Sequence, residues 1–268
     1  MKHSENTQKN YRFFCDIIKR EVGQFKIADL TPVAVWAMRD SISITHTSVA
    51  DLCVTIVSAL WQFAIEHQRL PLGHNPARGV FKLHRKKRIT KRWSDETIAK
   101  FDAAATPAVR LALYLLLYTG QRESDVITMQ WSHIQDDLIE VKQRKTDETV
   151  WIAIDPNLRR ILEQTPRINE HILNSERGRP FASSNGLARA IKRTLKEIGV
   201  DDHSGHGLRV SAAGALKEAG CSDDQVAAIT GHTNMKTLRL YLKEVNRQKL
   251  AREAGAKRVA ARANRGTA

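Results

Sequence analysis

The sequence predicts a mainly α-helical protein with one small antiparallel β-sheet, an α+β fold in two domains. Apolar residues recur at helical spacing along most of the chain, and only residues 131–154 change to a period of two. A break with two prolines at residues 70–76 and a basic segment at residues 82–92 separate a short helical part from a longer one. At 268 residues the chain is long enough for two cores. We therefore expect domains over residues 1–88 and 89–268.

Three helices are predicted in the first domain. Apolar residues at helical spacing indicate an amphipathic helix over residues 7–22. Thr31 followed by Pro32 is typical of a helix start, because threonine caps the first turn and proline suits its first position. A continuous apolar stripe over residues 47–67 predicts the third and longest helix.

The second domain is predicted to begin with two helices and a corner. Ser94 caps a helix that runs to about Ala105, with two acidic residues in its first turn. Pro107 starts the next helix, which is apolar almost all round and is expected at the centre of the domain. Gly120 ends that helix, so Arg122 follows directly at a corner where its side chain can face a cleft.

A β-hairpin is predicted after this corner. Residues 138–143 and 149–154 alternate between apolar and polar side chains, and Lys145 lies in the turn between them. Lysines at hairpin tips usually protect a sheet edge, and Lys142 and Arg144 lie close by. The hairpin alone therefore does not single out Lys145.

Further helices complete the second domain. Caps and apolar spacing place them at residues 156–164, from Ser183 or Ser184 to 198, at 206–219, at 223–229, at 235–242 and at 244–261.

Composition favours a polyanionic partner. Lys and Arg total 43 against 29 Asp and Glu, a net charge of +14. We expect no run of about 18 apolar residues that spans a bilayer and no signal peptide, hence a cytosolic protein that does not enter a membrane. The three cysteines, Cys15, Cys53 and Cys221, form no Cys-x-x-Cys pair, which argues against a disulfide framework or a zinc knuckle.

The basic segment at the expected domain boundary has two interpretations. It is either a solvated tether or a strap along a phosphate backbone. Its candidate DNA contacts are Arg85, Lys86, Lys87, Arg88, Lys91 and Arg92.

Residues 206–241 carry the strongest functional signal. His206-Gly-Leu-Arg209 is followed by Gly231-His232 and then by Tyr241. This order suits phosphoryl transfer to a tyrosine, since arginine and histidine bind phosphate oxygens and a phenol is a nucleophile. A rival interpretation is a divalent metal site, because two aspartates and His203 precede His206.

At these residues the chain resembles the tyrosine recombinase family, the phage integrases and their relatives. That family also has an arginine after a Thr-Gly turn and a lysine in a β-hairpin, which Thr119-Gly120-Gln121-Arg122 and Lys145-Thr146-Asp147 match. By motif order the resemblance covers residues 30–250. It departs at two positions, since the family usually has glutamate at the position of Asp125 and an apolar residue at that of Gln121. The catalytic set that it implies is Arg122, Lys145, His206, Arg209, His232 and Tyr241.

The resemblance also implies an activity and partners. The first domain would be a core-type DNA-binding domain and the second the catalytic domain. The protein would cleave and rejoin double-stranded DNA through a 3′-phosphotyrosine, with no metal and no cofactor, as a homotetramer on two DNA sites in the bacterial cytoplasm. Accessory DNA-bending or directionality proteins would assist it.

Two alternatives remain open. A type IB topoisomerase shares the same catalytic groups but relaxes DNA as a monomer, and the short helical N-terminal domain argues against it. A DNA-binding regulator without catalysis would need only the helices and the positive charge.

Overall fold

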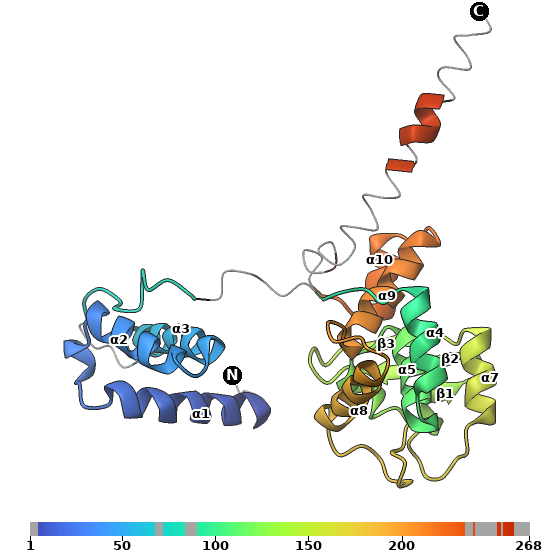
Figure 1. Ribbon diagram of the computed structural model, residues 1–268, viewed down its shortest axis with the longest axis horizontal. Helices are drawn as coiled ribbons and strands as arrows, with labels where there is room; N and C mark the ends of the chain where they lie inside the picture. The colour runs from blue at the N-terminus through green and yellow to red at the C-terminus, as the bar shows by residue number, and fades with distance from the viewer. Residues whose placement is uncertain are drawn as a thin grey trace, which may run out of the picture. The chain divides into compact units, whose positions relative to one another are not determined.

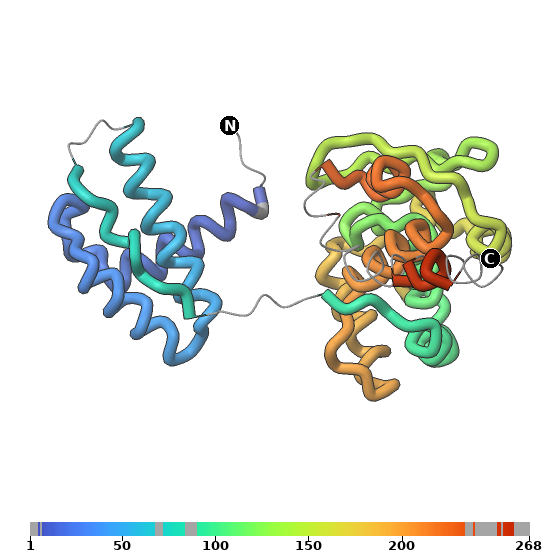
Figure 2. Tube along the Cα trace, turned by 90° about the horizontal axis from the view of Figure 1, so that it is seen from above, coloured from blue at the N-terminus to red at the C-terminus, as the bar shows by residue number. Residues whose placement is uncertain are grey.

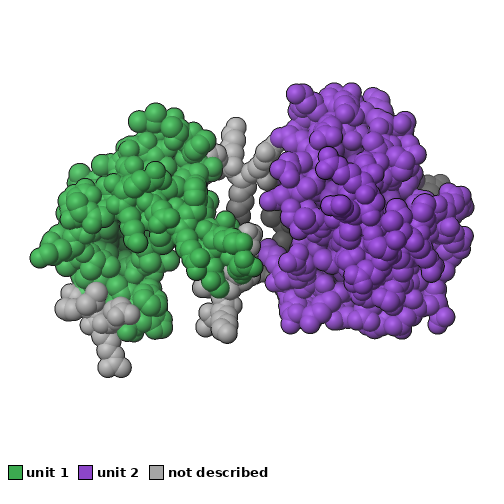
Figure 3. Space-filling model, turned by 90° about the horizontal axis from the view of Figure 1, so that it is seen from below, with its two compact units in different colours: residues 1–88 green, residues 89–268 purple. Residues whose placement is uncertain are grey.

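The computed structural model describes residues 5–67, 72–83, 90–233, 238, 251–252 and 254–259 of the chain. The chain forms two compact units, residues 1–88 and residues 89–268 (Figure 3). Each unit has its own hydrophobic core.

The first unit is a small bundle of three helices (Figure 1). They are α1 (Glu5–Val22), α2 (Pro32–Ser43) and α3 (Thr47–Glu66), with a 3₁₀ turn at Ile27–Asp29. The predicted cap is confirmed, since the hydroxyl of Thr31 accepts a hydrogen bond from the backbone N–H of Ala34 at 3.3 Å. Figure 2 shows the three helices packed against one another within this unit.

Helix α3 is the central helix of this bundle. By length and composition it is the one described helix that could cross a membrane. Its buried side chains include Ala50, Cys53 and Val57, which pack in the core of the unit together with α1 and α2. The apolar stripe of α3 therefore serves as a protein core.

The second unit is mainly helical. Its helices are α4 (Asp95–Ala104), α5 (Pro107–Thr119), α6 (Glu123–Val126), α7 (Pro156–Gln164), α8 (Ser184–Glu197), α9 (Gly205–Glu218) and α10 (Asp223–Thr230). Serine side chains cap two of them: Ser94 accepts from the N–H of Thr97, as predicted, and Ser222 accepts from that of Gln225. Helix α5 is buried in the centre, where Leu113, Leu115 and Leu116 are fully enclosed, and α9 packs against it.

A three-stranded antiparallel sheet lies in the same unit, after a 3₁₀ turn at Trp131–His133. Its strands are β1 (Ile134–Gln135), β2 (Leu138–Lys142) and β3 (Thr149–Ala153), in the order β1-β2-β3. Ile139 pairs with Ile152 and Val141 with Val150, and all four side chains face the core. This register leaves a turn at residues 143–148, so Lys145 lies in the turn as predicted, while Gln143, which the alternation places in the strand, lies just beyond its end.

The predicted helix at residues 235–242 lies outside the described residues except for Leu238. That residue is helical and fully buried against the small cluster of Ala213 and Val226. Of the predicted helix at 244–261, residues 251–252 and 254–259 are described, and they are helical.

Candidate active site

Five of the six predicted catalytic residues fall among the described residues, and they gather in one region of the second unit. Arg122 follows α5, His206 and Arg209 lie in the first turns of α9, His232 follows α10, and Lys145 lies in the turn between β2 and β3. Tyr241 lies outside the described residues.

The corner after α5 is built around Gly120. This residue has a left-handed conformation, with φ of 64°, and ends the helix by donating its N–H to the carbonyl of Leu116. A Cβ at Gly120 would press on Thr230 and Ala212, so the turn packs directly against α9 and α10. Its own carbonyl accepts a 2.8 Å hydrogen bond from Arg209.

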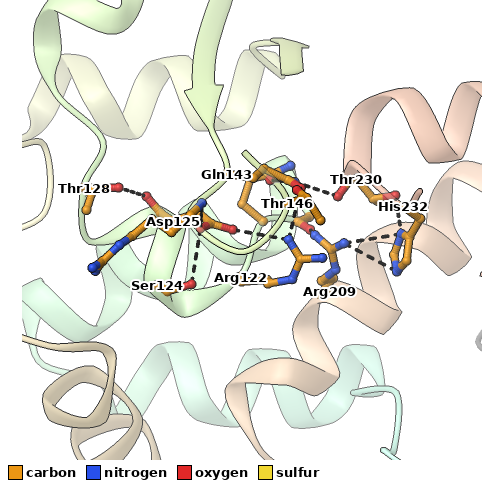
Figure 4. A network of polar contacts seen from close by, with 12 residues as sticks. Arg122, Ser124, Asp125, Thr128, Gln143, Thr146, Arg209, Thr230 and His232 are labelled. Carbon is orange, nitrogen blue, oxygen red and sulfur yellow. Dashed lines mark hydrogen bonds and ion pairs between the residues drawn. The ribbon is translucent and has the colours of Figure 1, made fainter. Parts of the chain in front are cut away.

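Arg122 lies between two buried acceptors (Figure 4). Its Nη1 donates to Oε1 of Gln143 at 3.0 Å and lies 3.7 Å from Oδ2 of Asp125. Asp125 is fully buried and also accepts from the backbone N–H of Arg144 at 3.0 Å. Although aspartate is shorter than the glutamate typical of this position, it contacts both Arg122 and the hairpin.

Arg209 is almost completely buried, with 1 % of its surface exposed. Its Nη2 lies 3.3 Å from Nδ1 of His232, and Figure 4 shows its guanidinium between Arg122 and that ring. The ring is also held by the hydroxyl of Thr230, which lies 2.7 Å from Nδ1. Two guanidiniums and an imidazole therefore face one small region, an arrangement that suits a phosphate.

The two histidines sit in a strongly positive environment. Burial lowers the pKa of His206, and the charges of Arg209, Arg122 and Lys145 lower it further. Burial also lowers the pKa of His232 to about 3, assisted by Arg209, Arg122 and His206. Both rings are therefore neutral at pH 7, and His206 can accept a proton.

These shifts predict a pH-dependent stability. Below the ordinary histidine pKa of 6.5, the unfolded chain binds a proton at His232 that the folded chain does not bind until about pH 3. Stability is thus present above pH 6.5 and is lost as the pH falls towards 3. We expect His232→Gln to reduce the difference between urea unfolding free energies at pH 7 and pH 5. The exposed His74→Gln is the control, and equal differences in both variants and the parent would contradict the prediction.

Lys145 is the exposed member of the cluster. The hairpin turn that carries it is bonded to the segment of Arg122, because the backbone N–H of Arg144 donates to Asp125 at 3.0 Å. The neighbouring Lys142 instead forms an ion pair with Asp147 at 3.1 Å, across the base of the turn. This difference favours Lys145 over Lys142 as the lysine that meets a substrate.

Two other sequence interpretations can be compared with the structure. Asp202 is paired with Lys91 and with His203, and the described residues hold no group of three potential metal ligands. Tyr114 and Tyr118 stack on each other with ring centres 6.0 Å apart, and burial raises the pKa of Tyr114 to about 12. Such a phenol is a poor nucleophile at neutral pH.

The basic segment divides into two parts. Arg85, Lys86, Lys87 and Arg88 lie outside the described residues. Lys91 pairs with Asp202, and Arg92 makes two hydrogen bonds to the carboxylate of Glu218, at 2.6 and 2.8 Å. These two side chains are therefore engaged within the second unit, which sequence reasoning did not foresee.

Sequence reasoning also missed Gln143. It is fully buried and touches Arg122, yet a glutamine at the end of a strand carries no obvious motif. One signal was present, since Gln143 continues the inward-facing alternation of Ile139 and Val141. A polar residue at an inward position must find partners within the protein.

Comparison with known proteins identifies the family. The sequence profile of the phage integrase family matches residues 87–247, more than half of the chain. The chain belongs to the phage integrase family. This integrase is 29% identical over 245 residues to the integrase of Escherichia phage lambda, over 85% of its own length and 67% of the lambda protein.

Solved structures of lambda integrase have the same fold as this integrase. A lambda integrase dimer bound to a COC′ core site matches with a TM-score of 0.79 at 25% identity, over 89% of each chain. A lambda integrase tetramer bound to a Holliday junction matches with a TM-score of 0.74 at 25% identity, over 87% of this chain and 73% of that one. The integrase is thus a site-specific tyrosine recombinase of the phage and mobile-element kind, and the predicted fold class and enzyme class are confirmed.

Proposed function

We propose that the second unit of this integrase cleaves double-stranded DNA with Tyr241 as the nucleophile. Arg122, Arg209 and His232 bind the phosphate that Tyr241 attacks. The observation that carries the proposal is the convergence of these three side chains from separate segments. Arg209 bonds to the carbonyl of Gly120 beside Arg122 and lies against the ring of His232. A phosphate between them would gain charge-assisted hydrogen bonds that strengthen as negative charge develops on its oxygens.

In the proposed reaction, the phenol oxygen of Tyr241 attacks phosphorus while the bond from phosphorus to the 5′-oxygen breaks. The phenol proton passes to His206, whose lowered pKa keeps it neutral and able to accept. Lys145 gives a proton to the departing 5′-oxygen, so the products are a 3′-phosphotyrosine and a free 5′-hydroxyl. The reverse sequence, with a 5′-hydroxyl as nucleophile, rejoins a strand.

The wider assignment follows from the same chemistry. The first unit, residues 1–88, would be a core-type DNA-binding domain, and residues 89–268 the catalytic domain with its C-terminal helix. Exchange of strands between two sites requires four active sites, hence a homotetramer on two DNAs. The lambda integrase dimer and tetramer on DNA support this assembly. We place the integrase in the bacterial cytoplasm, bound to DNA, with accessory DNA-bending or directionality proteins as further partners.

The proposal is tested by a covalent adduct. Duplexes that bind the protein are selected from a random-sequence pool, and each is nicked close to the expected cleavage point so that the released fragment diffuses away. We expect a denaturant-resistant adduct with a 3′-phosphotyrosine linkage, formed equally well in EDTA. Failure of all tightly bound duplexes to give an adduct would overturn the proposal, and an adduct abolished by EDTA would restore the metal interpretation.

The basic segment carries a separate prediction. Replacing Arg85, Lys86, Lys87 and Arg88 by glutamine should weaken DNA binding and flatten its dependence on salt, because each phosphate contact contributes about 0.9 to the logarithmic salt slope. Binding is measured between low and physiological salt. Arg92→Gln is the matched control, since Arg92 is paired with Glu218, and it should change the slope less. An unchanged slope in the fourfold variant would make the segment a plain tether.

A further inference from the structure

Two glutamines are fully buried beside the predicted catalytic cluster. Gln121 and Gln143 each have 0 % of their surface exposed. Burying an amide is unfavourable unless its donors and acceptors are all bonded within the protein. The contacts of the two side chains therefore show what they hold in place.

Gln143 uses its whole hydrogen-bonding capacity, two donors and two acceptor positions. Its Nε2 donates to Oε1 of Gln121 at 2.5 Å and to the carbonyl of Thr230 at 2.9 Å. Its Oε1 accepts from Nη1 of Arg122 at 3.0 Å and from the hydroxyl of Thr146 at 2.9 Å. Turning the amide over would lose its bonds to Arg122, Gln121 and Thr230, because a guanidinium can only donate and the two oxygens can only accept.

Gln121 fixes the direction of this amide. Its Nε2 donates to two backbone carbonyls, those of Thr119 at 3.1 Å and Ile229 at 2.8 Å. Its Oε1 must then face Gln143 and can only accept. Gln143 consequently presents Nε2 to Gln121 and Oε1 to Arg122, so the orientation of one amide sets that of the next.

The partners belong to three segments that carry predicted catalytic groups. Arg122 lies at the corner after α5. Thr146 is next to Lys145 in the hairpin turn, and Thr230 is two residues before His232. Gly231 packs against the same amide so closely that a Cβ there would overlap with it. Gln143 thus lies where the corner, the hairpin and the end of α10 meet (Figure 4).

We propose that Gln143, oriented by Gln121, is a positioning residue that sets the hairpin carrying Lys145 relative to Arg122 and His232. This inference rests on the proposed function. The amide pair fixes where the proton donor of the reaction lies with respect to the phosphate-binding groups. Displacement of about 1 Å in such a group can lower a rate by about 100-fold.

A purely structural role makes a different prediction. Exchanging both buried partners for apolar side chains of similar shape is often nearly neutral for stability, whereas losing only one leaves an unpaired amide. The double variant Q121M/Q143M removes both amides, but Arg122, Thr146 and three backbone carbonyls also lose a bond, so its stability is expected to fall. If the glutamines served only stability, the double variant that remains folded would still cleave at the parental rate. If they position catalytic groups, the double variant stays folded but remains slow.

The experiment measures single-turnover cleavage by the full chain, with Q143M, Q121M, Q121M/Q143M and a control, Q135M, which makes the same change at an exposed position of β1. Each is tested on DNA with the normal 5′-bridging oxygen and with a 5′-bridging sulfur, which leaves without a proton. Urea unfolding and DNA affinity are recorded for each variant.

We expect Q143M and the double variant to cleave the oxygen substrate about 10- to 100-fold more slowly than the parent, with DNA affinity within a few-fold. Sulfur should restore a large part of that loss, because the defect lies in proton delivery. Q135M should match the parent on both substrates. If Q143M does not fold, the double variant and Q121M carry the test.

Cleavage at the parental rate by the folded double variant would overturn the inference. An equal loss of rate on the oxygen and sulfur substrates would also overturn it, because the defect would then not lie in proton delivery from the hairpin. The proposed function fails differently. In that case the parent protein itself forms no adduct on either substrate, whereas the inference alone fails when the parent cleaves normally.

Discussion

Replacing Tyr241 by phenylalanine should abolish the covalent protein–DNA adduct while DNA affinity stays within a few-fold of the parent. The change removes one hydroxyl, and with it the only atom that can form the proposed phosphotyrosine bond. It touches none of the cationic groups that bind phosphate. Adduct formation on the nicked duplex is followed after denaturation, and affinity is followed separately by titration.

Two control variants make this test specific. Tyr114→Phe and Tyr118→Phe change the two stacked tyrosines of α5, which are partly buried and whose pKa values are raised by burial. Both variants should form adduct at close to the parental rate. A persistent adduct in Tyr241→Phe would refute the assignment of the nucleophile.

The helical framework of this integrase could be read from local chemistry. A threonine or serine before a first turn, a proline at its first position and a glycine with positive φ at its end act within a few residues, so Thr31, Ser94 and Gly120 place helix boundaries correctly. The change of period at the hairpin is equally local. These signals do not depend on the tertiary contacts that a single sequence leaves open.

Local sequence signals predicted only part of the candidate active site. The order of the motifs identified the residues that converge in the structure. Each of them lies at a helix end or in a turn, where short motifs can be recognised. Gln143 was not among them, since its position beside the catalytic groups is defined by hydrogen bonds to four partners that are spread along the chain between Gln121 and Thr230. The pairing of Arg92 with Glu218 likewise joins residues far apart in the chain. Long-range polar pairing leaves no periodic trace in a sequence.

The choice of Lys145 as proton donor predicts a second large effect. Lys145→Ala should slow cleavage of normal DNA by about 100- to 10,000-fold, the usual contribution of general acid catalysis. An alkoxide is a poor leaving group, because its conjugate acid has a pKa far above 7, and it departs readily only if a proton arrives with it. The exposed position of Lys145 in the hairpin turn suits delivery of that proton.

Comparison with Arg209→Ala separates proton donation from charge stabilisation. Arg209 is buried and bonded to the carbonyl of Gly120, so its loss removes phosphate binding in the transition state, with a cost of about 100- to 1,000-fold or more. A 5′-bridging sulfur should restore most of the cleavage lost in Lys145→Ala, because a thiolate leaves unprotonated, and should leave Arg209→Ala defective.

Rescue of both variants, or of neither, would exclude Lys145 as the general acid. Lys142→Ala provides the matched control on the same hairpin, since its ammonium is held by Asp147 at 3.1 Å. It should cleave both substrates at close to the parental rate. A sulfur-rescued defect in Lys142→Ala together with a normal Lys145→Ala would move the role of proton donor to Lys142. That outcome would require the ion pair with Asp147 to open when DNA binds.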